Sequence, residues 1–357
     1  MKKSLLCLLL VLSLVWLAGC GGQQAPAPAP EEPAGLTGEG SAVIIDDWEM
    51  PAFQPPIEYA GNAGFTEQVL LSTGPRLATI APDGTFLREI IPTGLGYFDF
   101  PRLSPDGTQF VVFVNYHEWT EPWETILLGD MATGQTTELN TAGAYYYYPP
   151  SWSHDGSQII YSAYDEDWVG NIYYTDVNTG ESGIFVDLSD FDDVDQEALE
   201  TATLHPTKEL LYFVAWSDSA DEYAVYEYDL AADDVRMVWS VDEPYVFHIA
   251  VSPRDDLLLV SAGIDITEDE ITTFGMYIVD TATGEGDLLF WEDGLQVIMA
   301  DFSPDGSQAI MCVDTRIIEN TWSQYLYDVD ANTATVVSRY VYDSAIEPFS
   351  PSWGIIP

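Results

Sequence analysis

The chain has 357 residues and carries 59 Asp and Glu against 10 Lys and Arg, a formal net charge of −49. With 47% apolar and 13% aromatic residues it is too hydrophobic for a disordered acidic chain, so most of it must fold around a core. The scarcity of basic residues argues against nucleic acid as a partner, because phosphate binding needs clustered Lys and Arg. It argues equally against docking by charge on an anionic lipid surface.

The first residues have the form of an export signal. Two lysines precede an apolar run, Leu5 to Ala18, that is shorter than the roughly 20 residues needed to cross a bilayer. The segment Leu17-Ala18-Gly19-Cys20 resembles the lipobox of bacterial lipoproteins. The resemblance implies a signal peptide at 1–19, cleavage before Cys20, and attachment of acyl chains such as palmitate to Cys20. We therefore expect an extracytoplasmic protein of the cell envelope, lipid-anchored to the bacterial membrane; the alternative is an ordinary signal peptide with an incidental cysteine.

The segment after Cys20 reads as a tether. Residues 20–40 are rich in Gly, Pro, Gln and Glu, a composition typical of a flexible linker, and 41–67 form an N-terminal extension before the repeats. Cleavage removes two lysines and no acid, so the net charge goes from −49 to −51. Of three cysteines only Cys312 then stays unmodified, in an apolar run where we expect a buried, inert thiol.

The rest of the chain repeats one unit about fifty residues long. The clearest copies of its turn are Ser104-Pro105-Asp106-Gly107, Ser153-His154-Asp155-Gly156 and Ser303-Pro304-Asp305-Gly306. An apolar residue precedes each turn, and the series of such residues is Leu103, Trp152, Leu204, Val251, Phe302 and Trp353, at intervals of 49, 52, 47, 51 and 51 residues. Each turn leads into a β-rich run, and a second hairpin turn follows, so each unit predicts about four short antiparallel strands.

Four-stranded units repeated in a circle make a β-propeller, so we predict an all-β fold with six blades over residues 68–357. The last unit contains only its first strand, around Trp353. The N-terminal strands around Pro82-Asp83-Gly84 are expected to supply the missing three and close the ring. The alternative is an extra blade from residues 41–65, which the prolines of that stretch disfavour.

The Trp-Ser-x-Asp-Gly turn followed by an apolar strand, as at Trp152 to Gly156, resembles the repeat of TolB-like propellers, which also occurs in Tricorn-type and prolyl-oligopeptidase-type peptidases. The resemblance implies a binding platform or an access gate. The chain departs from the peptidases because no catalytic domain follows the ring, and from TolB because no folded N-terminal domain is evident.

One mouth of the ring should carry the loops between second and third strands and the segments that enter each first strand. The entering segments include Tyr145–Tyr148, Asp190–Glu200 and Asp242–Tyr245. These parts combine carboxylates with aromatics, and His248 is expected on an innermost strand near the channel. The candidate binding residues are Trp119, Trp123, Tyr146, Tyr148, Asp165, Asp167, Trp168 and His248.

Three functions fit this mouth. The first is recognition of a protein, peptide or saccharide partner by a monomer, in which aromatics supply contact area and carboxylates favour basic groups. The second is calcium binding, for which the candidate ligands are Asp165, Asp167, Asp265 and Asp269. The third is catalysis by a hydrolase or lyase acting on a peptide or carbohydrate at the channel, although the sequence contains no catalytic motif. His154 and His205 fall in turns and are expected at the surface.

The charge gives a first prediction. Most carboxylates lack a basic partner, so raising NaCl from 0.15 M to 1 M, which shortens the Debye length from about 8 Å to about 3 Å, should raise the melting temperature. A larger rise with CaCl2 at matched ionic strength would indicate bound divalent cations. Melting curves that rise with neither salt would contradict both explanations.

Overall fold

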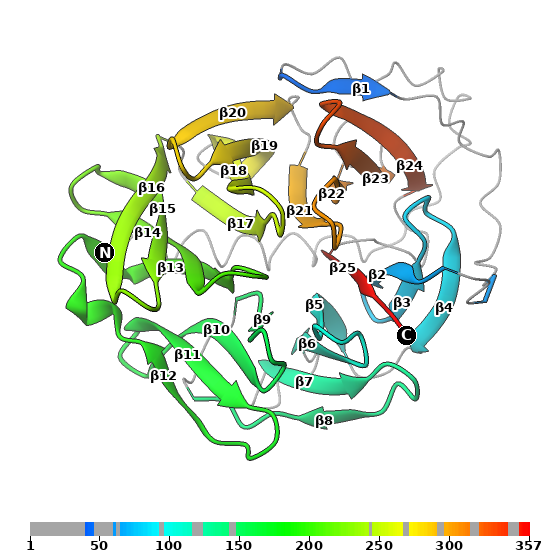
Figure 1. Ribbon diagram of the computed structural model, residues 1–357, viewed down its shortest axis with the longest axis horizontal. Helices are drawn as coiled ribbons and strands as arrows, with labels where there is room; N and C mark the ends of the chain where they lie inside the picture. Colours follow the sequence, from blue (N-terminus) through cyan, green and yellow to red (C-terminus); the bar gives the residue numbers. More distant parts are fainter. Residues whose placement is uncertain are drawn as a thin grey trace, which may run out of the picture.

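The computed structural model describes residues 40–45, 60–61, 65–92, 96–115, 124–142, 148–242, 245–266, 271–290, 296–314, 321–341 and 350–357. Within these residues the regular elements are all β-strands, apart from one 3-10 helix at Leu188–Asp190. Apart from β1, the strands form six antiparallel units of four, arranged around a common centre (Figure 1). The prediction of an all-β, six-bladed propeller is confirmed.

The blades are numbered from the one that contains both chain ends. Blade 1 has the order β25-β2-β3-β4 and blade 2 the order β5-β6-β7-β8. Their strands are β25 (Ser350–Ile355), β2 (Glu67–Ser72), β3 (Leu77–Ile80), β4 (Phe86–Ile91), β5 (Tyr97–Leu103), β6 (Gln109–Asn115), β7 (Glu124–Asp130) and β8 (Thr136–Glu138).

Blades 3 and 4 follow in the same order from the centre outward. Their strands are β9 (Ser151–Trp152), β10 (Gln158–Tyr164), β11 (Gly170–Asp176), β12 (Ser182–Val186), β13 (Val194–Leu204), β14 (Leu210–Ser217), β15 (Glu222–Asp229) and β16 (Asp234–Val241).

Blades 5 and 6 are joined to each other by one parallel pair, Phe274 with Gln296. Their strands are β17 (Tyr245–Val251), β18 (Leu257–Ile266), β19 (Ile271–Asp280), β20 (Glu285–Phe290), β21 (Gln296–Phe302), β22 (Gln308–Asp314), β23 (Thr321–Asp328) and β24 (Thr333–Val341).

The first strand of each blade lies nearest the centre. These strands touch in sequence around the ring, β25 with β5, β5 with β9, β9 with β13, β13 with β17, β17 with β21, and β21 with β25. In blade 1 the C-terminal strand pairs with an N-terminal strand, and Trp353 lies opposite Val69. Apolar side chains fill the spaces between neighbouring blades; one such core joins Val225 and Val238 of blade 4 to Ile249 and Val260 of blade 5.

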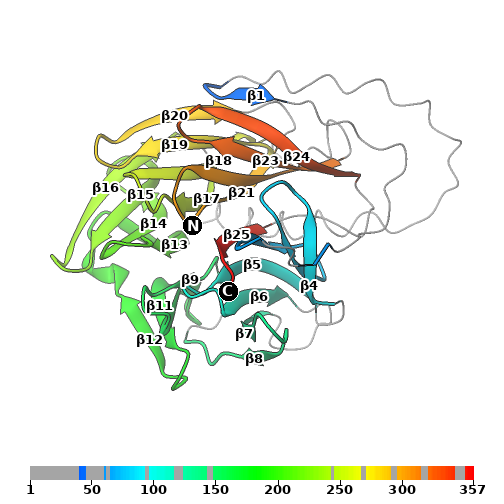
Figure 2. The same cartoon turned by 45° about the vertical axis from the view of Figure 1, so that its right-hand side comes forward.

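The described part of the N-terminal extension starts no additional blade. Strand β1 (Val43–Ile45) adds in parallel to the outer strand β24, and just before it Ser41 and Ala42 donate backbone hydrogen bonds to the carbonyls of Leu288 and Leu289 on β20. In both views β1 lies along the rim beside β20 and β24 (Figures 1 and 2).

The repeated turn is built from its own side chains. In the copy that follows Trp152, the Asp155 carboxylate accepts the backbone N–H and the hydroxyl of Ser157, and the Ser153 hydroxyl accepts the N–H of Gln158. The hydrogen bonds hold the pKa of Asp155 down at about 2. The copies at Asp106 and Asp305 make the same contacts.

Gly107, in the repeated turn of blade 2, and Gly180, in the hairpin turn between β11 and β12, allow the cost of backbone strain to be separated from that of steric contact. Gly107 and Gly180 both have left-handed backbones, with φ of +69° and +71°, but a Cβ at Gly107 would lie 1.8 Å from the carbonyl oxygen of Ile355 on β25, whereas one at Gly180 would meet nothing within 4 Å. We predict that Gly180→Ala lowers the free energy of unfolding by about 1 kcal/mol, the cost of the left-handed residue. Gly107→Ala should cost at least about 2 kcal/mol more, because it also pushes β25 away from blade 2.

Urea unfolding of the two variants checks this prediction. Equal losses would show that the contact between the Gly107 turn and β25 is unimportant for stability.

Candidate functional site

A buried carboxyl group lies where three blades meet at the loop-bearing mouth. Glu200, on β13, is 4% exposed. Its Oε2 accepts a hydrogen bond from the Tyr245 hydroxyl at 3.0 Å, its Oε1 accepts one from Tyr223 at 3.4 Å, and the Tyr148 hydroxyl also bonds to the carboxyl. Tyr148 enters blade 3, Tyr223 belongs to blade 4 and Tyr245 begins blade 5. The three entering segments singled out in the sequence therefore converge on one acid.

Burial controls the electrostatics of this cluster. Desolvation raises the pKa of Glu200 to about 8, although the hydrogen bonds from the tyrosines oppose the shift. Desolvation, and next the nearby Glu200, raise the pKa of Tyr148 and of Tyr245 well above the ordinary value. At neutral pH the centre of the cluster is therefore an uncharged carboxylic acid among neutral phenols.

Glu200 has counterparts at the same position of other repeats. It lies four residues before Leu204, and the residues four before Leu103, Trp152 and Val251 are Asp99, Tyr148 and Phe247. Burial raises the pKa of Asp99 to about 7. The repeat thus places two acids that hold their protons near neutrality at matching positions of blades 2 and 4.

An aromatic pair that includes Phe247 connects two opposite blades. The rings of Phe100 on β5 and Phe247 on β17 are 6.3 Å apart, and these strands belong to blades 2 and 5, three positions apart in a ring of six. Phe100 has a left-handed backbone, φ 52°, at an irregularity of the β5–β6 pairing. Strained backbones of this kind cluster at functional sites, and here the strain orients a ring that packs on Phe113 and Phe247.

Trp168 forms the exposed end of an aromatic series that leads to Glu200. It is 41% exposed, and its ring lies 6.1 Å from that of Tyr164, which in turn lies 6.5 Å from Tyr148. The turn that holds it is tight, because the Trp168 N–H donates to the carbonyl of Asp165 and φ of Trp168 is 63°. The structure therefore links the predicted residues Tyr148, which is buried, and Trp168, which is exposed, through the ring of Tyr164.

The carboxylates of the same turn have a local role. Oδ1 of Asp165 accepts the backbone N–H groups of Asp167 and Val169. Asp265 lies on β18 opposite Thr273, and Asp269 falls outside the described residues. Across the described ranges, no three His, Cys, Asp or Glu side chains lie close enough together to hold a metal ion. Trp119, Trp123, Tyr146 and Cys20 also fall outside the described residues.

His248 lies on the innermost strand of blade 5, as expected, and is 1% exposed. Its Nε2 lies 2.9 Å from the carbonyl of Ala300 in blade 6. Desolvation, and next the nearby Arg102, lower the pKa of His248 to about 3, so the imidazole is neutral. The contact joins two blades.

The prediction that His205 is a surface residue is wrong. It is 1% exposed, and its Nδ1 accepts the backbone N–H groups of Thr207 and Lys208, the place taken by a serine hydroxyl in the other turns. His154 is partly exposed, but its Nε2 contacts the carbonyl of His205 across the blade 3–blade 4 boundary. Both histidines therefore belong to a contact between blades.

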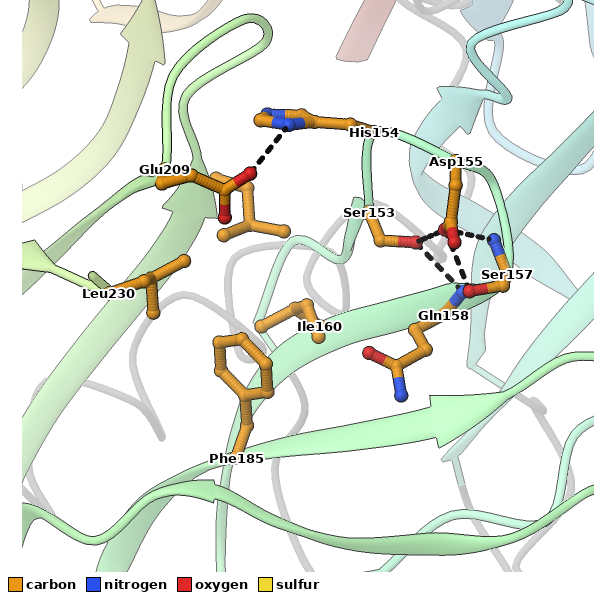
Figure 3. A pocket seen from close by; sticks show the side chains of 10 residues that line it. Ser153, His154, Asp155, Ser157, Gln158, Ile160, Phe185, Glu209 and Leu230 are labelled. Carbon is orange, nitrogen blue, oxygen red and sulfur yellow. Dashed lines mark hydrogen bonds and ion pairs between the residues drawn. The ribbon is translucent and has the colours of Figure 1, made fainter.

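That boundary also contains a cavity of about 330 Å³ at the turn-bearing end, opposite the mouth. Figure 3 shows Glu209 and His154 facing each other on one side of the cavity, with Ile160, Phe185 and Leu230 around it. The distance from His154 Nδ1 to Glu209 Oε1 is 3.8 Å.

Sequence reasoning did not select Glu200, Tyr223 or Tyr245 as individual site residues. Two of them stand in the entering segments Asp190–Glu200 and Asp242–Tyr245, which were the available signal. These three side chains meet because adjacent blades pack in a particular alignment, and a local sequence pattern does not predict that alignment.

Comparison with solved structures supports the fold. The structure of TolB from Acinetobacter baumannii matches with a TM-score of 0.59 at 17% identity, over 81% of this chain and 66% of the TolB chain. A chain of a nidogen/laminin complex matches with a TM-score of 0.58 at 9% identity, over 81% of this chain and 98% of its own length. The chain thus spans just under two thirds of that TolB and has a TolB-like propeller fold. The sequence matches no protein-family model and no curated protein.

No helix among the described residues is long and apolar enough to cross a membrane.

The Glu200 cluster predicts a pH dependence of stability. The pKa of Glu200 is raised from 4.5 to about 8 in the folded chain, so between these values the folded state keeps a proton that the unfolded state releases. Its contribution is therefore fully present below about pH 4.5 and is lost as pH rises through about 8, by at most about 5 kcal/mol. Glu200→Gln, which stays neutral, should lose less stability than the wild type between pH 5 and 9.

Urea unfolding at several pH values measures this difference. Glu181→Gln, which removes an exposed carboxylate, is the control and should follow the wild type. Parallel curves for wild type and Glu200→Gln would contradict the assignment.

Proposed function

We propose that the chain is an extracytoplasmic, lipid-anchored binding module of the cell envelope, which recognises a protein, peptide or saccharide partner through the loop-bearing mouth of its propeller. The anchor is the lipid on Cys20 implied by the lipobox resemblance, and residues 20–40 are the tether. The propeller fold supports this proposal, because its rigid ring presents variable loops on one face.

The observation that carries the proposal is the aromatic series from Trp168 through Tyr164 and Tyr148 to Glu200. A large aromatic side chain that is 41% exposed and held in a left-handed backbone has a cost in both solvation and strain. Aromatics of this kind supply the contact area of binding sites, and sugar faces and apolar side chains stack on them. The buried carboxyl beneath holds the tyrosines of the series in place through their hydroxyls.

The comparison with TolB supports the fold of such a module and no particular partner. Calcium in the loops that contain Asp165, Asp167, Asp265 and Asp269 stays a prediction, which the CaCl2 melting curve tests.

A second candidate function is hydrolysis or lyase chemistry on a peptide or carbohydrate. Its support is that Asp99 and Glu200 hold their protons near neutral pH, as a general acid must. Breakdown of a bound peptide or saccharide that Glu200→Gln abolishes would favour this function over binding alone.

Binding through the mouth can be tested with paired variants of one blade. Immobilised protein is offered cell-envelope extract and a glycan array, and the ligands retained are compared among wild type, Trp168→Ala and Ile184→Ala. Ile184 is the control because it is 49% exposed on the outer strand β12 of the same blade. We expect Ile184→Ala to retain the ligand and Trp168→Ala to bind it at least tenfold more weakly. Equal retention by both variants would contradict a site at the mouth.

A further inference from the structure

The same kind of arginine contact occurs at two blade boundaries, at the end of the ring that carries the turns. Nη2 of Arg88 on β4 donates to the carbonyl of Met131 in blade 2, and Nη2 of Arg236 on β16 donates to the carbonyl of Thr281 in blade 5, at 3.0 Å. Each acceptor directly follows the aspartate that ends the third strand of its blade, Asp130 or Asp280. An arginine on the outer strand of one blade thus binds the outer turn of the next.

The boundary between blades 3 and 4 lacks this arginine. In blade 4, Arg236 lies seven residues after Asp229 and pairs with Glu227. The equivalent residue of blade 3 is Gly183, which lies seven residues after Asp176 and pairs with Tyr174. The acceptor position, directly after Asp229, is Leu230. The 330 Å³ cavity is lined by Leu230 and by Phe185, two residues from Gly183 on β12, so it lies where the missing side chain would enter.

The lining of the cavity suits a cation on an apolar stem. Ile160, Phe185, Leu204 and Leu230 are apolar, and the Glu209 carboxylate stands at the entrance with its side chain 72% exposed. Arginine covers apolar surface with its methylenes and keeps its charged end at an acid. A chain with net charge −49 also attracts cations to such a site.

We propose that the cavity between blades 3 and 4 is a second binding site, separate from the mouth, which takes an arginine side chain of a partner protein. The guanidinium lies between the Glu209 carboxylate and the carbonyl of Leu230, in the manner of Arg236 at Thr281, and the stem packs on Ile160 and Phe185. Arginine fits better than lysine because its planar fork can bond to a carboxylate and a carbonyl at once.

A matched pair of small ligands tests the charge requirement. The full chain is titrated with N-acetylarginine methylamide and with N-acetylcitrulline methylamide, which has nearly the same shape but no charge, and amide chemical shifts are followed by NMR. We expect saturable shifts at Glu209 and Leu230 with the arginine ligand and at least tenfold weaker binding of the citrulline ligand. Equal binding of the two, or no shift at these residues with either, would overturn the proposal.

Variants test the location. Glu209→Gln should weaken arginine binding at least fivefold, whereas Glu285→Gln, which removes an exposed acid of blade 5, should leave it unchanged. Gly183→Arg should restore the internal contact and abolish binding of the free ligand. A Cβ at Gly183 meets only the ring end of Tyr174, at 3.3 Å, so this variant is expected to fold, and its melting temperature verifies that. Equal weakening by both glutamine variants would indicate general attraction to negative charge and would overturn the site.

Discussion

The contact between neighbouring blades is the constraint on which the rest of this structure depends. Each blade is a small sheet that cannot bury its faces alone, so the ring exists only where adjacent sheets pack and bond. Serine hydroxyls supply part of this bonding without charge. The second strands of blades 1, 3 and 5 each carry a serine that donates to a first-strand carbonyl of the next blade, namely Ser72 to Phe98, Ser162 to Glu200 and Ser261 to Val297. Neutral bonds of this kind suit a chain whose self-repulsion would be worsened by further carboxylates at its boundaries.

Several of the few basic residues also make contacts between blades. Besides Arg88 and Arg236, Arg102 on β5 donates to the carbonyl of Pro351 in blade 1, Lys208 pairs with Asp256 in blade 5, and Arg254 pairs with Asp330 in blade 6. Arg88, Arg102 and Arg236 bond to backbone carbonyls of the neighbouring blade. The two ion pairs are partly exposed, so each stabilises its boundary only weakly. Among the described residues, the boundary of blades 3 and 4 has none of these contacts; a histidine, His154, faces Glu209 there, and the outer-strand position is a glycine. The cavity lies at this boundary.

Local chemistry explains which features could be predicted from sequence. The turn at Ser153 to Gly156 is set by hydrogen bonds within five residues, so its sequence alone specifies the hairpin, and the fifty-residue spacing then specifies the blades. The sequence indicated Glu200 only as part of a longer segment. The tyrosines that surround it come from three blades, and one of them, Tyr148, is 52 residues away in the chain. His205 was placed wrongly because a ring nitrogen replaced the serine oxygen of the turn, and this substitution drew the side chain inward. A histidine in a turn is usually exposed, whereas His205 is buried because its ring accepts backbone N–H groups of its own turn.

One strand connects the two proposed sites. Strand β13 carries Glu200 at the mouth and, four residues later, Leu204 at the cavity. Between these ends it is held to blade 3 twice, since the Ser162 hydroxyl donates to the Glu200 carbonyl and the Leu204 N–H donates to Ser151. A substitution in β13 would therefore disturb both sites through the same boundary and could not tell them apart. Trp168 and Gly183 lie away from β13, on a loop of blade 3 and on its outer strand, so changes there separate the function of the mouth from that of the cavity.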